Sequence, residues 1–453
     1  MNKNFDPQNV VLTFNVMSDV HVSGSWYQKE SKEKLINGLE YARKVTGNPV
    51  DAYVFCGDFV DCMNSKANVL LGDGWGDDYE TAKAEQSARE FETLRYAFQN
   101  HIPEEAEIIY CLGNHDSTNR NNIDRFIEEF SSLDEIGDGK YYDRMYRTDL
   151  DHESLKNGMR HCVCKGYHFL CIDVEDAEPD FNKTIEFLKK NLDEITAKEP
   201  DKYVFVVYHY KPVHTVFLSD THHPTSARRI GNLLKNYPQV ILLTGHNHTT
   251  VCNERAIMQD KYTVLECGCV SYVMPWWVFK EPNVEHSEHY ELSEGMLFEI
   301  DKNGSVRITR LDYSNRKPIK GAWELPAPQA DGSHLKVYTE DLKYTVRKPE
   351  FAKDAKIKIE ETKPEGKTKI TFSKALGDAR DIFRYQIVVT DTNGNVSVHH
   401  PSSLFCYPND SRHKEDTLEL TIGQSYEYLY KIVITAQDFW FNDSDPLVYF
   451  HKI

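Results

Sequence analysis

No hydrophobic run in the sequence approaches the ~20 apolar residues that a membrane-spanning helix requires. Residues 1–9 are polar and lack the apolar segment of a secretory signal, and the apolar stretch after them is interrupted by Asn15 and Asp19. We interpret that stretch as a strand and not as a leader. The sequence therefore predicts no membrane partner and favours a cytoplasmic protein.

Positive charge is also scarce, because 53 Lys and Arg residues face 71 Asp and Glu residues, which leaves a net charge of −18. A protein that binds nucleic acid needs clustered Lys and Arg to neutralise phosphates. The acidic balance thus argues against a nucleic-acid partner. It is compatible with a small phosphorylated substrate, because bound metal ions supply positive charge locally.

Cysteine accounts for only ten of the 453 residues, and a chain of this size does not need a disulfide framework. Cys56, Cys111 and Cys171 lie within apolar runs that we interpret as buried strands, so reduced core thiols are favoured. The pair Cys267 and Cys269 has no second pair nearby, which argues against a zinc knuckle. These features favour a reducing compartment.

The chain does contain enough hydrophobic residues (40%) and aromatic residues (12%) for a folded globular protein. Its length predicts two or three domains. In residues 1–317, apolar runs first alternate with helical periodicity and then give way mostly to strands. This order predicts a layered α/β domain that combines parallel and antiparallel strand pairing.

The rest of the chain predicts a linker and a second domain. Residues 318–333 are rich in proline and polar residues and are interpreted as the linker. Residues 334–453 contain only short, regularly spaced strands, with a hairpin signal at Asn393-Gly394, and predict a C-terminal all-β sandwich. The stretch 428–438, followed by Ser444-Asp445-Pro446, resembles the last strands of a fibronectin type III domain. Binding of carbohydrate, docking of a protein partner and a structural brace all stay open for this domain.

Polar motifs follow five predicted strands of the first domain. In open α/β sheets the carboxyl ends of the strands usually carry the functional site. Each motif alone is a weak signal, but the ordered set is not expected by chance. The motifs are Asp19-Val20-His21, Gly57-Asp58, Gly113-Asn114-His115-Asp116, His209 and Gly245-His246-Asn247-His248.

The residue types and spacings of these motifs point to metal binding. In an extended segment, residues i and i+2 point to the same side, so Asp19 can converge with His21, and His246 with His248. Carboxylate, amide oxygen and imidazole together suit Mn, Fe or Zn better than Ca. A carboxylate such as Asp58 can bridge two ions ~3.5–4 Å apart, as in two-metal hydrolysis.

The ordered set, from Asp19-x-His21 through Gly57-Asp58-x-x-Asp61 to Gly245-His246-x-His248, resembles the calcineurin-like metallophosphoesterases over roughly residues 10–315. The resemblance implies a central β-sandwich flanked by helices, with a dinuclear metal site at one edge. It further implies that Asp58 bridges the two ions and that His115 is the general acid, with Asp116 as its orienting partner. One ion would be held by Asp19, His21 and His248, and the other by Asn114, His209 and His246.

One position departs from a branch of this family. Purple acid phosphatases carry a Tyr three residues after the bridging Asp, whereas this chain has Asp61 there. We therefore do not expect a tyrosinate–iron centre. Two interpretations of Asp61 stay open: a group that orients a metal-ligating His, or a solvated loop carboxylate.

The substrate is indicated less clearly. Aromatic residues after the strand at 262–267 could stack on a base or sugar, although a core or interface role fits them as well. Two arginines could touch phosphate, although helical arginines usually face solvent, and three histidines enrich the loop after His209. These candidates are Trp276, Trp277, Phe279, Arg228, Arg229, His214, His222 and His223.

The sequence thus predicts a metal-dependent hydrolase of a small phosphodiester or phosphomonoester, such as a nucleotide or a glycerol-phosphate compound. A nuclease that uses the same site is an alternative, which the acidic balance disfavours. A non-catalytic binding scaffold on the same fold is another. Such a scaffold should lack a metal ligand or the acid His115, and none of these residues is missing here.

Overall fold

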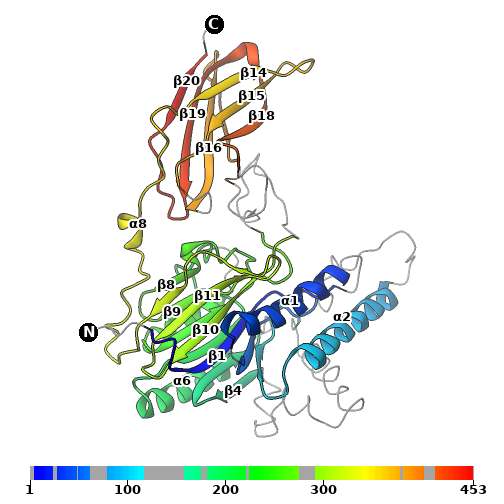
Figure 1. The fold of residues 1–453 in the computed structure, drawn as a ribbon, viewed down its shortest axis with the longest axis vertical. Coiled ribbons are helices and arrows are strands. Elements are labelled where there is room, and N and C mark those ends of the chain that lie inside the picture. The colour runs from blue at the N-terminus through cyan, green and yellow to red at the C-terminus, as the bar shows by residue number, and fades with distance from the viewer. Residues whose placement is uncertain are drawn as a thin grey trace. The chain divides into compact units, whose positions relative to one another are not determined.

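In the computed structural model the chain forms two compact units (Figure 1). The first comprises Met1–Val251, Ala256–Val273 and His289–Glu340, and the second comprises Cys252–Arg255, Met274–Glu288 and Asp341–Ile453. The structure describes residues 5–23, 28–47, 49–61, 79–116, 158–174, 181–220, 224–274, 291–377, 381–401, 403 and 414–451.

The first unit contains a seven-stranded mixed sheet. Its strand order is β12-β11-β10-β1-β2-β3, and β13 also pairs with β11. Strands β1, β2 and β3 are parallel, whereas β10 is antiparallel to β1. The strands are β1 (Val10–Met17), β2 (Ala52–Cys56), β3 (Glu107–Cys111), β10 (Glu294–Asp301), β11 (Val306–Asp312), β12 (Lys317–Pro318) and β13 (Trp323–Leu325).

A six-stranded sheet of order β4-β5-β6-β7-β9-β8 accompanies it. Its four inner strands are parallel, and each edge strand is antiparallel to its neighbour. The inner strands are near-continuous apolar runs, as expected for parallel strands buried on both faces. The strands are β4 (Met159–Cys164), β5 (Tyr167–Ile172), β6 (Val204–Tyr208), β7 (Val240–Thr244), β8 (Ile257–Gln259) and β9 (Thr263–Glu266).

Aromatic side chains join the two sheets into a sandwich. The ring of Phe14 on β1 lies 5.3 Å from that of Phe169 on β5 and 5.0 Å from that of Phe205 on β6, both edge to face. Phe14 also stacks on Phe298 of the neighbouring strand β10, at 4.7 Å. Burying each such ring contributes about 1.5–3 kcal/mol to stability. The core between the sheets therefore fixes the strand ends that carry the functional residues.

Helices cover the outer faces of the sandwich. Helices α1 (Gln28–Thr46) and α2 (Tyr79–His101) lie side by side against the first sheet (Figure 1). Helix α1 buries Leu35, Leu39 and Ala42, a spacing that places them on one helix face. Helices α6 (Phe181–Lys198) and α7 (Thr225–Leu234) belong to the second sheet, with α6 packed on β5 and β6. These layers confirm the predicted α/β sandwich.

The predicted linker at 318–333 contains parts of the first unit. Residue Pro318 belongs to β12, and β13 lies wholly within this range and pairs with β11. Beyond it, the backbone amides of Val337 and Tyr338 donate to Gln259 Oε1 at 3.0 and 3.1 Å. The first unit therefore extends to Glu340. Strands of two and three residues have no periodicity that a sequence pattern could detect.

The second unit is all-β apart from the one-turn helix α8 (Leu342–Thr345) and a 3-10 turn, within its described residues. A three-stranded antiparallel sheet, β14-β15-β18, and a four-stranded one, β17-β16-β19-β20, share one hydrophobic cluster. This arrangement confirms the C-terminal all-β fold. The strands are β14 (Ile357–Glu361), β15 (Lys367–Ser373), β16 (Ile382–Asp391), β17 (Val396–His399), β18 (Thr417–Ser425), β19 (Leu429–Asp438) and β20 (Leu447–Phe450).

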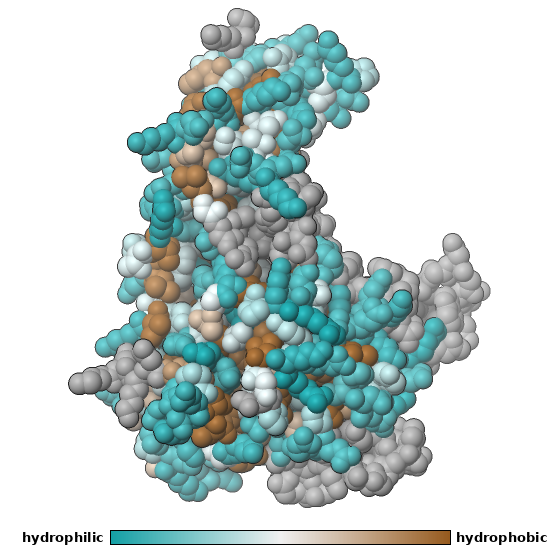
Figure 2. Space-filling view, in the orientation of Figure 1, coloured by the Kyte–Doolittle hydropathy of each residue, from teal (hydrophilic) through white to brown (hydrophobic). Residues whose placement is uncertain are grey.

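The surface and the cysteines agree with the composition. Hydrophilic residues dominate the face of the molecule seen in Figure 2. No helix in the described ranges is long and apolar enough to cross a membrane. The described cysteines, which include Cys56, Cys111 and Cys171, are all free and buried, as predicted for reduced core thiols.

Candidate metal centre

The predicted site residues lie in loops that directly follow parallel strands of both sheets. Asp19 and His21 follow β1, Asp58 follows β2, and Asn114 follows β3. In the second sheet, His209 ends β6, and the loop after β7 carries His246 and His248. The sandwich core aligns these strand ends at one edge. The structure brings all seven side chains together there, in two groups.

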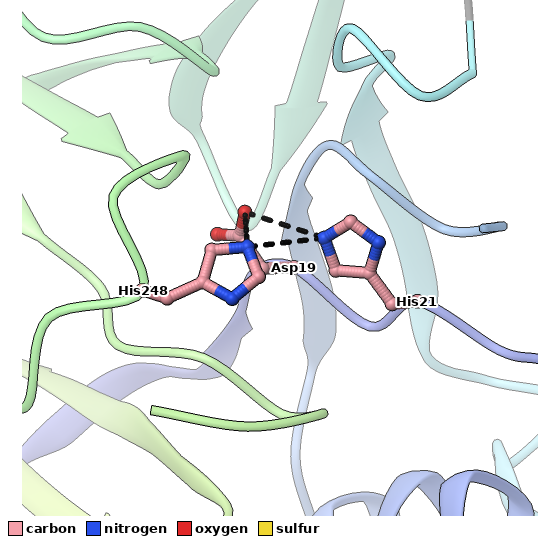
Figure 3. Close-up of side chains that lie close together, drawn as sticks. All are labelled: Asp19, His21 and His248. Atoms are coloured by element: carbon pink, nitrogen blue, oxygen red, sulfur yellow. Dashed lines mark hydrogen bonds and ion pairs between the residues drawn. The ribbon is translucent and has the colours of Figure 1, made fainter. Parts of the chain in front are cut away.

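The first group consists of Asp19, His21 and His248 (Figure 3). The Nε2 atom of His248 lies 3.1 Å from Asp19 Oδ1 and 3.1 Å from His21 Nε2. The Nδ1 atom of His248 faces the carbonyl oxygen of Tyr272 at 3.2 Å. Because a carbonyl only accepts, Nδ1 carries the hydrogen and Nε2 presents a lone pair. Electron-rich atoms thus face one another, an arrangement that a cation stabilises.

The second group consists of Asp58, His209 and His246, with Asn114 beside it. The Nε2 atom of His209 lies 3.0 Å from Asp58 Oδ2 and 3.1 Å from Asn114 Oδ1. The Nδ1 atom of His209 donates to the Cys56 carbonyl at 2.7 Å, which leaves a lone pair on Nε2. Asp58 Oδ2 also lies 3.6 Å from His21 Nε2 of the first group. Asp58 is therefore placed between the two groups.

Oxygen and imidazole donors of this kind fit transition metal ions. Asp19, Asp58 and the rings of His21, His209 and His248 are almost fully buried, so their charges require compensation. Burial opposes the charged form of His209, but the Asp58 carboxylate outweighs it and raises the pKa of His209 to about 9. Burial likewise opposes ionisation of Asp58, but His209 and His115 hold the pKa of that carboxyl below its usual value. The negative charge of the carboxylates, which favours protonated histidine rings, equally favours bound metal cations.

The backbone conformation at the site corrects one expectation. Asp19 and His21 were expected to converge as residues i and i+2 of an extended segment, and so were His246 and His248. Instead these four residues and Asp58 have φ between 39° and 77°, in the left-handed region. A non-glycine residue there costs of order 1–3 kcal/mol and is usually found where function requires it. The side chains therefore converge because the chain coils tightly after each strand.

Two glycines permit this coil. Gly57 has φ +91°, and a Cβ there would lie 2.7 Å from the backbone nitrogen of Gly113. Gly245 has no unusual φ, but a Cβ there would lie 1.8 Å from Ser18 Oγ and 2.4 Å from Asp19 Oδ2. Only glycine fits these positions, at the first because of conformation and at the second because of close approach.

Hydrogen bonds hold the carboxylates in place. Asp19 Oδ2 accepts from the His246 backbone amide at 2.9 Å and from Ser18 Oγ at 2.6 Å. Asp58 Oδ1 accepts from the His115 backbone amide at 2.8 Å. Each carboxylate keeps its other oxygen close to a histidine Nε2 atom. Such bonds orient a ligand before a metal binds.

Asp116 has different partners from those that the family resemblance implies. Its carboxylate accepts hydrogen bonds from the backbone amides of Phe59 at 2.8 Å, Val60 at 3.2 Å and Gly113 at 2.9 Å. Burial raises the pKa of Asp116 to about 7. Asp116 therefore ties the loop after β2 to the loop after β3, and it does not bond to the ring of His115.

The neighbour of the His115 ring is Asp61. His115 Nδ1 lies 3.2 Å from the Asp61 carbonyl oxygen and 3.9 Å from its Oδ1 atom, which is also 3.5 Å from His21 Nδ1. Of the two open interpretations of Asp61, this geometry favours the group that orients a histidine. The His115 side chain is 24% exposed, so it can reach a molecule from solvent.

Buried ion pairs support the site and were not found from the sequence. Arg160 donates two hydrogen bonds of 2.6 Å to Asp173, whose Oδ1 also accepts from the Leu112 amide at 2.7 Å, just before the loop with Asn114. Lys211 and Glu266 form a second fully buried pair, in which burial raises the pKa of Glu266 to about 7. In the sequence, the only sign of these pairs is a charged residue within or beside an apolar strand. The partner of each such residue is distant in sequence, so the pairing itself could not be predicted.

The substrate candidates are only partly described. Arg229 Nη2 donates to Asn182 Oδ1 at 2.6 Å, and His214 faces Asp220 at 2.8 Å. Arg228 lies on the same helix as Arg229. The remaining candidates, Trp276, Trp277, Phe279, His222 and His223, lie outside the described residues.

Two known groups of proteins are similar to this chain. No curated protein matches the chain. One similar solved structure is a purple acid phosphatase from yellow lupin (Lupinus luteus) seeds, with 11% sequence identity and a TM-score of 0.40. The match covers 74% of this chain and 57% of that one, so the chain spans little more than half of that protein. The model of the calcineurin-like phosphoesterase family matches residues 12–250, more than half of the chain and all seven candidate ligands. The chain therefore belongs to the calcineurin-like phosphoesterase family, whose members are metal-dependent hydrolases of phosphate esters.

Proposed function

We propose that this protein hydrolyses phosphate esters at a dinuclear metal centre that is bridged by Asp58. The observation that carries the proposal is the position of Asp58 Oδ2, 3.0 Å from His209 Nε2 and 3.6 Å from His21 Nε2. A single carboxylate is thus shared by two sets of ligands. Asp19, His21 and His248 would hold one ion, and Asn114, His209 and His246 the other.

The ligand chemistry suits Mn, Fe or Zn. Two such ions, when bound, supply positive charge to phosphoryl oxygens and make water a nucleophile near neutral pH. Because Asp61 replaces the tyrosine of purple acid phosphatases, a tyrosinate–iron centre is not proposed. The buried loops keep the ligands rigid, so little reorganisation is needed during the reaction.

His115 is proposed as the general acid that protonates the leaving oxygen. Its backbone is fixed by the bond to Asp58 Oδ1, and its ring lies edge to face against His21, with 4.6 Å between centroids. Burial lowers the pKa of His115, while Asp58 and Asp61 oppose this shift. Asp61 is proposed to hold the ring and to favour its protonated form, a role that the resemblance assigned to Asp116.

A small phosphodiester or phosphomonoester, such as a nucleotide or a glycerol-phosphate compound, is the proposed substrate. The net charge of −18 supports a small molecule over nucleic acid. The test is hydrolysis of a panel of phosphate monoesters, diesters and single-stranded DNA by the purified full chain with Mn²⁺. Turnover of small esters alone supports the proposal, whereas preferential DNA cleavage indicates a nuclease. No turnover of any ester with Mn²⁺, Fe²⁺ or Zn²⁺ would indicate a binding scaffold.

For the second unit we propose a fibronectin type III-like module. Its three-stranded and four-stranded sheets around one core support this assignment. The fold does not identify a ligand. Carbohydrate and protein stay the two candidate partners, and screening the isolated unit against glycans would separate them.

A further inference from the structure

A cavity of about 360 Å³ lies in the first unit, between helix α7, strands β8 and β9, and the loop at 212–215. None of its lining residues belongs to the seven candidate metal ligands. Pro212 lines the cavity and follows His209 by three residues, and a chain spans at most ~3.6 Å per residue. The cavity is therefore distinct from the metal centre, but its near wall starts within about 11 Å of His209.

A tyrosine hydroxyl in this cavity has no hydrogen-bond partner among the residues that the structure describes. The side chain of Tyr262 is 5% exposed, and its hydroxyl makes no hydrogen bond within the described part of the chain. The hydroxyl itself is not among the fully buried polar atoms, so it opens into the cavity and can bond to water or to a ligand there. Burial also raises the pKa of Tyr262, so the hydroxyl stays protonated and can donate.

The space beside this hydroxyl is kept open by a glycine inside a helix. Gly231 lies in α7, and a Cβ there would lie 3.2 Å from Tyr262 Oη and 2.7 Å from Pro212 Cβ. Glycine inside a helix is unfavourable relative to alanine. An alanine would narrow the gap between Pro212 and the hydroxyl, so the glycine maintains the cavity.

Two cations, one within α7 and one at its C-cap, line the same cavity. Arg228 and Lys235 are seven residues apart, two helical turns, and therefore lie on one helix face. Arg228 forms no ion pair or hydrogen bond with the described residues, and Lys235 Nζ donates only to Asn232 Oδ1, at 3.1 Å. Arg229 differs, because it donates to Asn182 at 2.6 Å and does not line the cavity. The cationic side of the cavity is thus available to an anion.

We propose that this cavity binds a small phosphate-bearing molecule, with Arg228, Lys235 and Tyr262 as donors to the phosphate. Three donors match the three terminal oxygens of a phosphate monoester, whereas a carboxylate has two oxygens. Arginine binds such groups through paired hydrogen bonds, and lysine acts as a point charge. The side chains of Met258 and Val264 form an apolar wall for the uncharged part of the molecule. This binding does not depend on hydrolysis at the metal centre.

A carboxylate also lines the cavity, and its removal should strengthen phosphate binding, whereas loss of a cation should weaken it. Asp260, two residues before Tyr262, also lines the cavity, and its carboxylate repels a bound phosphate. Asp260→Asn should therefore strengthen phosphate binding by roughly two- to fivefold, as expected for one partly exposed charge. Damage to the fold would weaken binding instead.

The experiment is calorimetric titration of the full-length protein with inorganic phosphate at low ionic strength, where exposed charges are not screened. Phosphate also binds metal ions, so the titration is made in an Asp58→Asn background as well as in the wild type. We expect Arg228→Gln to weaken binding ~10-fold or more, and Tyr262→Phe about 2- to 10-fold. Arg229→Gln is the matched control on the same helix and should change binding less than about twofold.

Three results would overturn the proposal. One is phosphate binding that disappears in the Asp58→Asn background, because the ion then binds only at the metal centre. Another is an equal effect of Arg228→Gln and Arg229→Gln, which would indicate unspecific attraction to the helix. The third is acetate binding as tightly as phosphate, which would assign the cavity to carboxylates. Thermal melting of each variant verifies that it is folded.

Discussion

The loops of the metal centre and the hairpins of the second unit differ in the backbone and in the charges that they bury. In the first unit, Asp19, Asp58 and His248 combine positive φ with nearly complete burial of a polar side chain. In the described part of the second unit, Phe441 is the one non-glycine residue with positive φ. Ion pairs of the second unit, such as Lys369–Glu419, lie at the surface.

The loops of the metal centre are therefore the places where functional requirements lower the stability of the fold. Strained residues cost about 1–3 kcal/mol each, and buried charges cost more unless they are paired. In the described part of the second unit, Phe441 alone carries such strain, and the unit is held by an aliphatic and aromatic cluster that includes Ile387, Val389 and Ile434. The strained loops of the first unit are therefore expected to gain stability when cations bind between their ligands.

The largest expected effect comes from Asp58→Asn. Because Asp58 lies between both ligand groups, this change should weaken both metal sites together. The loss of activity should exceed the ~10–100-fold that follows removal of a supporting hydrogen bond. Asn114→Ala is the comparison, because it affects one site only. Measured kcat and bound metal should both fall further for Asp58→Asn, and equal losses would contradict a bridging role.

His115→Ala should affect chemistry without affecting metal content. For an alkyl phosphate ester, whose alkoxide needs a proton, kcat should fall ~10²–10⁴-fold. For a nitrophenyl ester, whose phenolate departs unaided, the loss should be much smaller. Steady-state kinetics on the two esters, with elemental analysis of the variant, measure this difference. Equal losses on both esters together with lost metal would show that His115 is a ligand.

Asp61→Asn should have a smaller effect of ~10–100-fold, because Asp61 is proposed to act through two histidines and not as a metal ligand. Its Oδ1 atom lies 3.5 Å from His21 Nδ1 and 3.9 Å from His115 Nδ1. The alkaline limb of the pH profile of kcat, where His115 loses its proton, should move to lower pH, because the Asp61 carboxylate favours the protonated ring. An unchanged pH profile and unchanged activity would indicate a solvated carboxylate.

The smallest effect on activity is expected from removal of residues 341–453. All candidate ligands and the sheets around them precede Asp341, so hydrolysis of a small ester should be retained. A chain that ends at Pro328 should melt at a lower temperature. It loses the bonds from Val337 and Tyr338 to Gln259 and from His334 to Pro238, each worth about 0.5–1.5 kcal/mol. Inactivity of the chain that ends at Glu340 would show that the second unit completes the site.

The sequence was sufficient to predict where the longer strands lie along the chain and that the motifs converge, because each motif directly follows an apolar run. It did not predict the left-handed turns at Asp19 and His21, since the motif is equally compatible with an extended segment. The sequence also did not predict the partners of Asp116 or the ion pair between Arg160 and Asp173. These contacts join loops and strands that are distant in sequence, and no local pattern specifies them.

The most direct test of the account is the number of metal ions that the intact protein binds. Elemental analysis after incubation with Mn²⁺, Fe²⁺ or Zn²⁺ and removal of free metal should give two equivalents per chain, because two ligand groups share Asp58. Thermal stability should rise as both sites fill. A single equivalent under metal-saturating conditions, with full activity, would contradict the dinuclear centre.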